Sequence, residues 1–81
     1  MNLVELTEYL VKSLVKDSDS VSVKEFETEY DSVLIQVLVD SSVIGSVIGK
    51  GGKIANSIRT IVQASSYLNG NKRVKINIDS F

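Results

Sequence analysis

Apolar residues at the start of the chain recur at the period of a helix. Between residues 3 and 16 they form one stripe, which comprises Leu3, Leu6, Leu10 and Leu14. Asn2 precedes the stripe and Glu5 follows three residues later, a pairing typical of a capping box. Lys12 and Lys16 place positive charge near the C-terminal end, where it suits the helix dipole. This pattern predicts a helix over residues 3–16.

Two segments that alternate between apolar and polar residues follow a polar loop. Over residues 21–30 the apolar positions change phase at Lys24-Glu25, which predicts a strand with a bulge at that point. Asp31-Ser32 is short enough for a hairpin turn. Residues 33–39 place every β-branched side chain on one face, and the other face carries Leu34, Gln36 and Leu38. This segment is therefore the predicted central strand.

After the central strand the chain predicts a short helix and then a long one. Asp40 or Ser41 can cap the short helix, which must end at Gly49. Its expected buried side comprises Val43, Ile44, Val47 and Ile48. The long helix begins at about Gly52. Its inward stripe follows the helical period and comprises Ile54, Ile58, Ile61, Val62, Ser65 and Leu68.

A final strand follows the helix stop at Asn69-Gly70. It alternates, with Val74, Ile76 and Ile78 pointing inward. The order is then helix, strand, strand, helix, helix, strand. A hairpin joins the first two strands, and the crossover through two helices makes the last strand parallel to the central one. The sequence therefore predicts an α+β fold in which helices cover one face of a three-stranded mixed sheet.

Composition narrows the possible chemistry. A chain of 81 residues is expected to form one domain over residues 1–81. It has no cysteine and no histidine, so neither a thiolate metal site nor an imidazole base is available. We therefore expect no enzyme, no metal and no cofactor. The first residues lack the pattern of a signal peptide, and no apolar run approaches the ~20 residues of a membrane span. A cytoplasmic chain is the expectation, with no membrane partner.

Charge is divided between the two halves of the chain. Residues 1–40 hold nine carboxylates against three lysines, a net charge of −6. Residues 41–78 hold no carboxylate and a net charge of +6, from Lys50, Lys53, Arg59, Lys72, Arg73 and Lys75. Basic residues can simply be solvated surface, but so complete a division favours an anionic partner for the second half.

The segment Gly49-Lys50-Gly51-Gly52 lies between the two predicted helices. Three glycines permit positive φ and leave Lys50 with the only Cβ. The helix that follows begins with unpaired N–H groups, which favour a phosphate. The phosphate loop of NTPases does not fit, because its spacing is one residue short here and Gly51 replaces the metal-binding hydroxyl. The dinucleotide fingerprint fails because Ile54 stands where its third glycine belongs. A plain glycine-rich turn is the structural alternative.

Residues 48–54, placed between two helices, resemble the GxxG loop of a KH domain, which clamps four nucleotides of a single strand. The element order resembles the type II arrangement, and the whole chain is similar to the small stand-alone bacterial KH proteins of the KhpA type. This resemblance implies a non-enzymatic, cytoplasmic RNA-binding protein, such as an RNA chaperone or a post-transcriptional regulator. It also implies a homodimer, or a pairing with a second KH protein of the KhpB type.

We predict that single-stranded RNA lies beside this loop. The expected contacts are Gly49, Lys50, Gly51, Gly52 and Lys53, then Asn56 and Arg59 about one turn along the helix, with Lys72 and Arg73 closing the other side. No aromatic residue lies near the loop in the sequence, so sequence preference should be slight. The alternative is a module that docks a protein, for which Leu34 and Leu38 on the open face of the sheet are the candidate surface.

Overall fold

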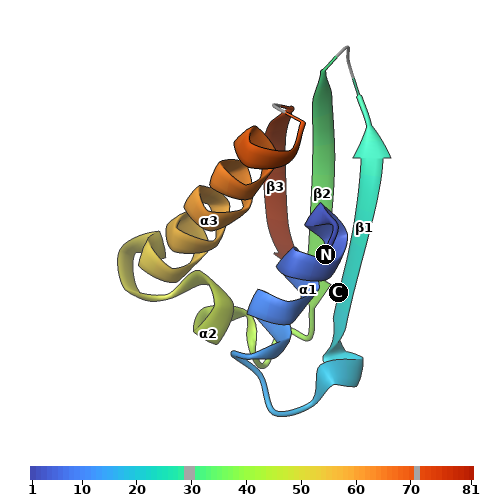
Figure 1. The fold of residues 1–81 in the computed structure, drawn as a ribbon. Coiled ribbons are helices and arrows are strands. Elements are labelled where there is room, and N and C mark those ends of the chain that lie inside the picture. The colour runs from blue at the N-terminus through green and yellow to red at the C-terminus, as the bar shows by residue number, and fades with distance from the viewer. Residues whose placement is uncertain (29–30, 71) are drawn as a thin grey trace.

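The computed structural model describes residues 1–28, 31–70 and 72–81, and its elements follow the predicted order (Figure 1). They are α1 (Leu3–Lys12), β1 (Val21–Glu27), β2 (Ser32–Val39), α2 (Ile44–Ile48), α3 (Lys53–Asn69) and β3 (Arg73–Ser80). Two short 3-10 turns, Ser18–Ser20 and Lys50–Gly52, precede β1 and α3. The predicted α+β organisation is confirmed.

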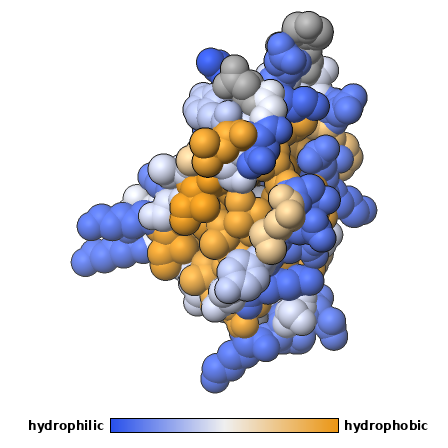
Figure 2. Space-filling model, in the orientation of Figure 1, coloured by the Kyte–Doolittle hydropathy of each residue, from blue (hydrophilic) through white to orange (hydrophobic). Residues whose placement is uncertain are grey.

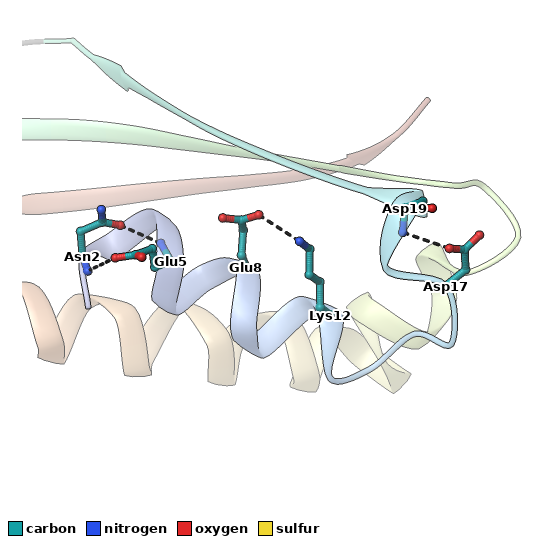
Figure 3. A network of polar contacts seen from close by, with 6 residues as sticks. All are labelled: Asn2, Glu5, Glu8, Lys12, Asp17 and Asp19. Carbon is teal, nitrogen blue, oxygen red and sulfur yellow. Dashed lines mark hydrogen bonds and ion pairs between the residues drawn. The ribbon is translucent and has the colours of Figure 1, made fainter.

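The three strands form one mixed sheet in the order β1-β2-β3. β1 pairs with β2 in antiparallel fashion, from Val21 opposite Val39 to Glu27 opposite Val33. β3 runs parallel to β2, as the two-helix crossover requires. Seen edge-on, the strands make one layer and the helices make the other (Figure 3). The opposite face of the sheet is therefore left open, and the prediction of helices on one face is confirmed.

The core lies between β2 and the helices. Every second residue of β2 is buried, namely Val33, Ile35, Val37 and Val39. The helices and the third strand complete this cluster with Val11, Val47, Ile58, Val62 and Ile76. Full burial of each such side chain contributes about 1.5–3 kcal/mol to stability. β2, the predicted central strand, is central in the sheet and also supplies four of the buried core residues.

The predicted bulge in β1 is wrong, because the pairing with β2 runs without a break. Residues opposite one another in register share a face. Val21 and Val23 lie opposite buried residues of β2 and face the helices, whereas Phe26 lies opposite Leu34 on the open face. The change of phase at Lys24-Glu25 therefore marks the point at which the apolar residues of β1 move from the face that packs on the helices to the open face of the sheet. Residues 29 and 30 of the predicted strand lie outside the described residues.

The predicted hairpin turn is also displaced. Ser32 already belongs to β2, and Asp31 before it adopts a positive φ of 60°. The connection between β1 and β2 therefore falls before Ser32, partly in residues that the structure does not describe.

The capping box at the start of α1 is confirmed (Figure 3). The Asn2 backbone N–H donates to Glu5 Oε1 at 3.0 Å, and the Glu5 N–H donates to Asn2 Oδ1 at 2.8 Å. The helix is shorter than predicted and ends at Lys12. Ser13 is its C-cap, and both the backbone N–H and the hydroxyl of Ser13 donate to the carbonyl of Tyr9. Leu14 consequently lies outside the helix and is exposed.

α2 begins later than predicted, and neither Asp40 nor Ser41 caps it. Its N-cap is Val43, which makes no side-chain capping bond. Asp40 instead accepts hydrogen bonds from the backbone N–H and then the hydroxyl of Ser42, and these bonds lower the pKa of Asp40 below its usual value. The end of α2 at Gly49 is confirmed.

The buried face of α3 differs from the predicted stripe. Ile58 and Val62 are buried as expected, but Ala55 and Ser66 share the inward face with them. Ile54, Ile61 and Leu68 are 36%, 46% and 85% exposed. Figure 2 shows apolar surface gathered along α3 and the adjoining part of α1, on the side of the molecule that the helices form. Ile54, Ile61 and Leu68 therefore stand beside the core rather than in it, whereas Ile58 belongs to it.

We predict that Asn2→Ala lowers the free energy of unfolding by about 1 kcal/mol, because the N–H of Glu5 loses its acceptor, Asn2 Oδ1. Urea unfolding followed by circular dichroism measures this change. Lys16→Ala, an exposed site beyond the helix end, serves as the control and should change stability by less than about 0.5 kcal/mol. Equal effects of the two substitutions would contradict the role given to the capping box.

Candidate nucleic-acid interface

The loop Gly49–Gly52, called the GxxG loop from here on, has the backbone that its glycines were expected to permit. Gly49 ends α2 with φ 77° and ψ 168°, a region that is essentially closed to other residues. Gly51 (φ 63°, ψ 18°) and Gly52 (φ 77°, ψ 12°) are both left-handed. With these angles the chain passes from α2 through the 3-10 turn Lys50–Gly52 into α3 within four residues.

The glycines differ in what surrounds them. A Cβ on Gly49 would stand 2.6 Å from Cγ1 of Ile54, so the Ile54 side chain lies against the bare backbone of Gly49. A Cβ on Gly51 would meet nothing within 4 Å. Gly49 is therefore required by internal packing, whereas Gly51 presents open backbone to a ligand.

Positive potential gathers where α3 begins. Gly52 is its N-cap and provides no side-chain bond. The N–H of Lys53 donates to the carbonyl of Lys50, so the N–H groups that need partners from outside the helix are the next ones in the first turn. Lys50 and Lys53 are exposed on either side. α3 contains no carboxylate at all, and its 17 residues give a full helix dipole at this end. The arrangement suits an anion that approaches the loop.

The structure brings Asn56 and Arg59 together. Arg59 Nη1 donates to Asn56 Oδ1 at 3.0 Å, and Arg59 Nε donates to the carbonyl of Ile76 at 3.3 Å. The guanidinium is thereby anchored on the outer edge of β3, while Arg59 as a whole stays exposed. Both predicted residues lie on the side of α3 that faces β3.

A groove continues from Arg59 along this side, and we call it the α3–β3 groove. Its hollow has a volume of about 480 Å³ and is lined by Arg59, Thr60, Gln63, Ala64, Tyr67 and Val74. Gln63 spans it, donating to the carbonyl of Lys72 and accepting from the N–H of Val74, both at 2.9 Å. Sequence reasoning overlooked Gln63 and Tyr67 as site residues. Their spacing from Asn56, at i+7 and i+11, was the signal that could have found them.

Lys72 and Arg73 do not join the GxxG loop. They follow the C-terminal end of α3, and a helix of 17 residues at about 1.5 Å per residue is about 25 Å long. Lys72 stands at the far end of the α3–β3 groove, where its carbonyl also accepts from the Ser66 hydroxyl. Arg73 alternates with Val74 and so projects to the open face of the sheet. The predicted set thus divides into a loop cluster and a distant pair.

Within the described residues, the one ion pair is Glu8–Lys12 at 3.2 Å (Figure 3). The bases along α3 and β3 are therefore not neutralised by carboxylates of the described chain. The same residues contain no group of three His, Cys, Asp or Glu side chains that could hold a metal ion. None of their helices has the length and apolar character needed to cross a membrane.

Comparison with known proteins places these features in a family context. The family described as KhpA/KhpB, KH domain matches residues 4–78 of this chain. A relative from Borreliella burgdorferi named RNA-binding protein KhpA is 39% identical over 77 residues, covering 95% of this chain and 92% of the relative. A protein of the same name from Aquifex aeolicus is 42% identical over 76 residues, covering 94% of each chain.

Solved structures share the fold at lower identity. Aquifex aeolicus Era bound to GDP.AlF4- superposes with a TM-score of 0.74 at 18% identity. A structure of Era in complex with MgGDPNP and nucleotides of 16S ribosomal RNA gives a TM-score of 0.72 at 18% identity. The match covers 98% and 96% of this chain but only 30% and 29% of the Era chains. The likeness therefore concerns one part of Era and establishes the fold alone.

We predict that Gly49→Ala destabilises the protein more than Gly51→Ala does. Gly51→Ala places a Cβ in the left-handed region, which costs about 1–2 kcal/mol, whereas the backbone of Gly49 lies in a region that is essentially closed to other residues. Gly49→Ala also forces the Cβ into Ile54, which adds about 1–3 kcal/mol. Thermal and urea unfolding of the two variants measure the difference. Equal losses would show that Ile54 does not lie on Gly49.

Proposed function

This chain belongs to the KhpA/KhpB family of KH domains, and from that membership we propose that it binds single-stranded RNA through its GxxG loop. Its α+β architecture is the type II KH fold that the sequence predicted. The observation that carries the proposal is the open backbone of Gly51, set between two exposed lysines at the start of a helix without carboxylates.

Contact with the RNA backbone begins at the loop. The positive φ angles of Gly51 and Gly52 let phosphates approach the main chain without meeting a Cβ. N–H groups at the start of α3 donate to phosphate oxygens. Lys50 and Lys53 add charge through long side chains, which adjust to different nucleotides because each is a point charge on a flexible stem.

The strand then follows the α3–β3 groove. Arg59 and Asn56 are already positioned by each other and by Ile76, so they lose little freedom on binding. Further along, Tyr67 is 56% exposed beside Gln63 and offers a ring on which a base can stack. Lys72 stands at the end of this path. A KH domain holds about four nucleotides, so we expect one copy to bind a strand of about that length at the loop and the first part of the groove.

Binding by one copy should be weak and of low sequence specificity. With about 2–4 phosphates neutralised, the slope of log affinity against log salt should be about −1.4 to −2.8. The acidic first half of the chain further reduces nonspecific attraction. Such a protein is suited to act as an RNA chaperone or a post-transcriptional regulator in the cytoplasm, without catalysing a reaction and without a cofactor. The competing function is that of a KH-shaped module that docks a protein. In that case substitutions in the GxxG loop should leave the binding of the partner protein unchanged.

The test is the double variant Lys50→Asp/Gly51→Asp. It reverses the charge of the loop, while Asp tolerates the left-handed conformation of Gly51, so the fold should persist. We expect loss of RNA binding in a gel-shift titration with a single-stranded oligonucleotide. Lys16→Asp/Ser18→Asp makes the same change in net charge at exposed sites distant from the loop and should bind nearly as the parent does. Parent-like binding by the loop variant would refute the assignment.

We also propose that the chain forms a homodimer through the outer face of α3. Ile61 lies seven residues from both Ile54 and Leu68, and all three are exposed. Two copies of α3 packed antiparallel about a two-fold axis at Ile61 would bring Ile61 against its mate and Ile54 against Leu68 of the other copy. Ser57 and Ser65 are equally distant from Ile61 and are small enough to let the helices approach. The GxxG loops would then stand at opposite ends, and two weak sites on one RNA would bind by avidity.

We predict that Ile61→Glu makes the protein monomeric, because the two-fold axis brings both new carboxylates together without partners. Sedimentation equilibrium measures the change. Thr60→Glu, an exposed neighbour on the polar side of α3, is the matched control and should leave the dimer intact. A parent protein that is monomeric at high concentration would contradict the homodimer and leave this face to a KhpB-type partner.

A further inference from the structure

The face of the sheet opposite the helices carries an aromatic ring among basic side chains. Phe26, Leu34 and Lys75 are register partners across the three strands and so lie side by side on this face. Lys24 and Arg73 are two residues from Phe26 and Lys75 on their strands, and they share the face as well. Phe26 is 43% exposed despite its large apolar ring.

A hollow of about 260 Å³ opens on this face. Leu34 and Val33 contribute apolar walls, Arg73 and Lys75 contribute cations, and Asn77 contributes an amide. Among the residues that the structure describes, no carboxylate lines it. An apolar floor beside an aromatic ring, with cations at the rim, matches a nucleotide, which joins a flat base to a phosphate.

The carboxylates near this face lie at its margins. Asp79 lies on the same face, but at the other end of the sheet, where it is the register partner of Leu38. There Asp79 Oδ1 accepts a hydrogen bond from the N–H of Ser80. Asp31 stands at the corner, because its carbonyl accepts from the N–H of Arg73 at 2.9 Å, and it does not line the hollow. Among the described residues, the charges closest to Leu34 on this face are therefore those of Arg73, Lys75 and Lys24.

The open face continues the path of the α3–β3 groove. That groove ends at Lys72, whose carbonyl is held by Gln63 and Ser66. Arg73 is the next residue and projects to the other side of the sheet. A strand that leaves the groove past Lys72 therefore passes around the start of β3 and meets Arg73, then Lys75.

We propose that the open face holds a second nucleotide-binding subsite, centred on Phe26, Leu34, Arg73 and Lys75, for the continuation of the same RNA strand. Phe26 stacks on a base above Leu34, while Arg73 and Lys75 bind the adjoining phosphates. The proposal rests on the proposed function in taking RNA as the ligand. It adds that an RNA strand too long for the GxxG loop and the α3–β3 groove continues onto the open face of the sheet.

The experiment compares two oligonucleotides of repeating uridine and adenosine, a tetranucleotide and a decanucleotide, by fluorescence anisotropy. The face variant is Phe26→Leu/Lys75→Gln, which removes the ring and one cation while keeping apolar contact with Leu34. We expect it to bind the tetranucleotide as the parent does and the decanucleotide at least about fivefold more weakly. Phe81→Leu/Lys16→Gln makes the same changes at exposed sites elsewhere and should bind both as the parent does. Circular dichroism confirms that each variant is folded.

Amide chemical shifts of the parent provide an independent readout. The decanucleotide should shift amides of residues 24–28 and 73–77 that the tetranucleotide leaves unchanged. If the face variant binds the decanucleotide within about twofold of the parent and these amides stay still, the subsite is wrong while the loop function stands; a face reserved for a protein would give this result. If the parent binds neither oligonucleotide, the proposed RNA-binding function fails, and the subsite fails with it.

Discussion

The contact between Ile54 and the bare backbone of Gly49 is the constraint on which the candidate site depends. Ile54 occupies the space that a Cβ of residue 49 would need, so the end of α2 is pressed against the first turn of α3. The chain can make this connection only by adopting backbone angles reserved for glycine. Because the contact with Ile54 fixes Gly49, the position of the neighbouring residues Lys50 and Gly51 is fixed as well. Its glycines allow the loop many backbone conformations, but the contact with Ile54 fixes its position against the first turn of α3.

The sheet converts the division of charge along the chain into a division across the molecule. The acidic first half supplies α1 and β1, and β1 is one edge of the sheet. The basic second half supplies α3 and β3, and β3 is the other edge. A polyanion is therefore attracted to the β3 edge and repelled from the β1 edge, which orients the encounter before any specific contact forms. A nearly neutral protein can in this way present a consistently basic path.

The sequence predicted the order of elements, the central strand and the chain reversal at the glycines, because each follows from local periodicity or backbone freedom. It did not predict which side of α3 is buried. Ile54, Ile61 and Leu68 fit a helical period as well as the true inward residues do, and only packing against β2 distinguishes two adjacent stripes. Lys72 and Arg73 were expected to close the other side of the groove beside the GxxG loop, because the sequence alone does not give their distance from that loop. Their separation from it follows from the length of α3 and the direction of β3. The change of phase at Phe26 is likewise ambiguous until the register of β1 is known.

The side chain of Gln63 has a consequence for how this protein behaves at high concentration. β3 is an edge strand, and such strands offer unpaired backbone groups that can recruit strands from other molecules. Here the amide of Gln63 imitates a neighbouring strand by pairing with both Lys72 and Val74, and Arg59 pairs with Ile76. Side chains of α3 thus satisfy several backbone hydrogen-bonding groups at the edge of the sheet. These hydrogen bonds leave fewer backbone groups of β3 free to pair with a strand of another molecule, which disfavours edge-to-edge aggregation. The α3–β3 groove beside the same edge remains open to nucleotides.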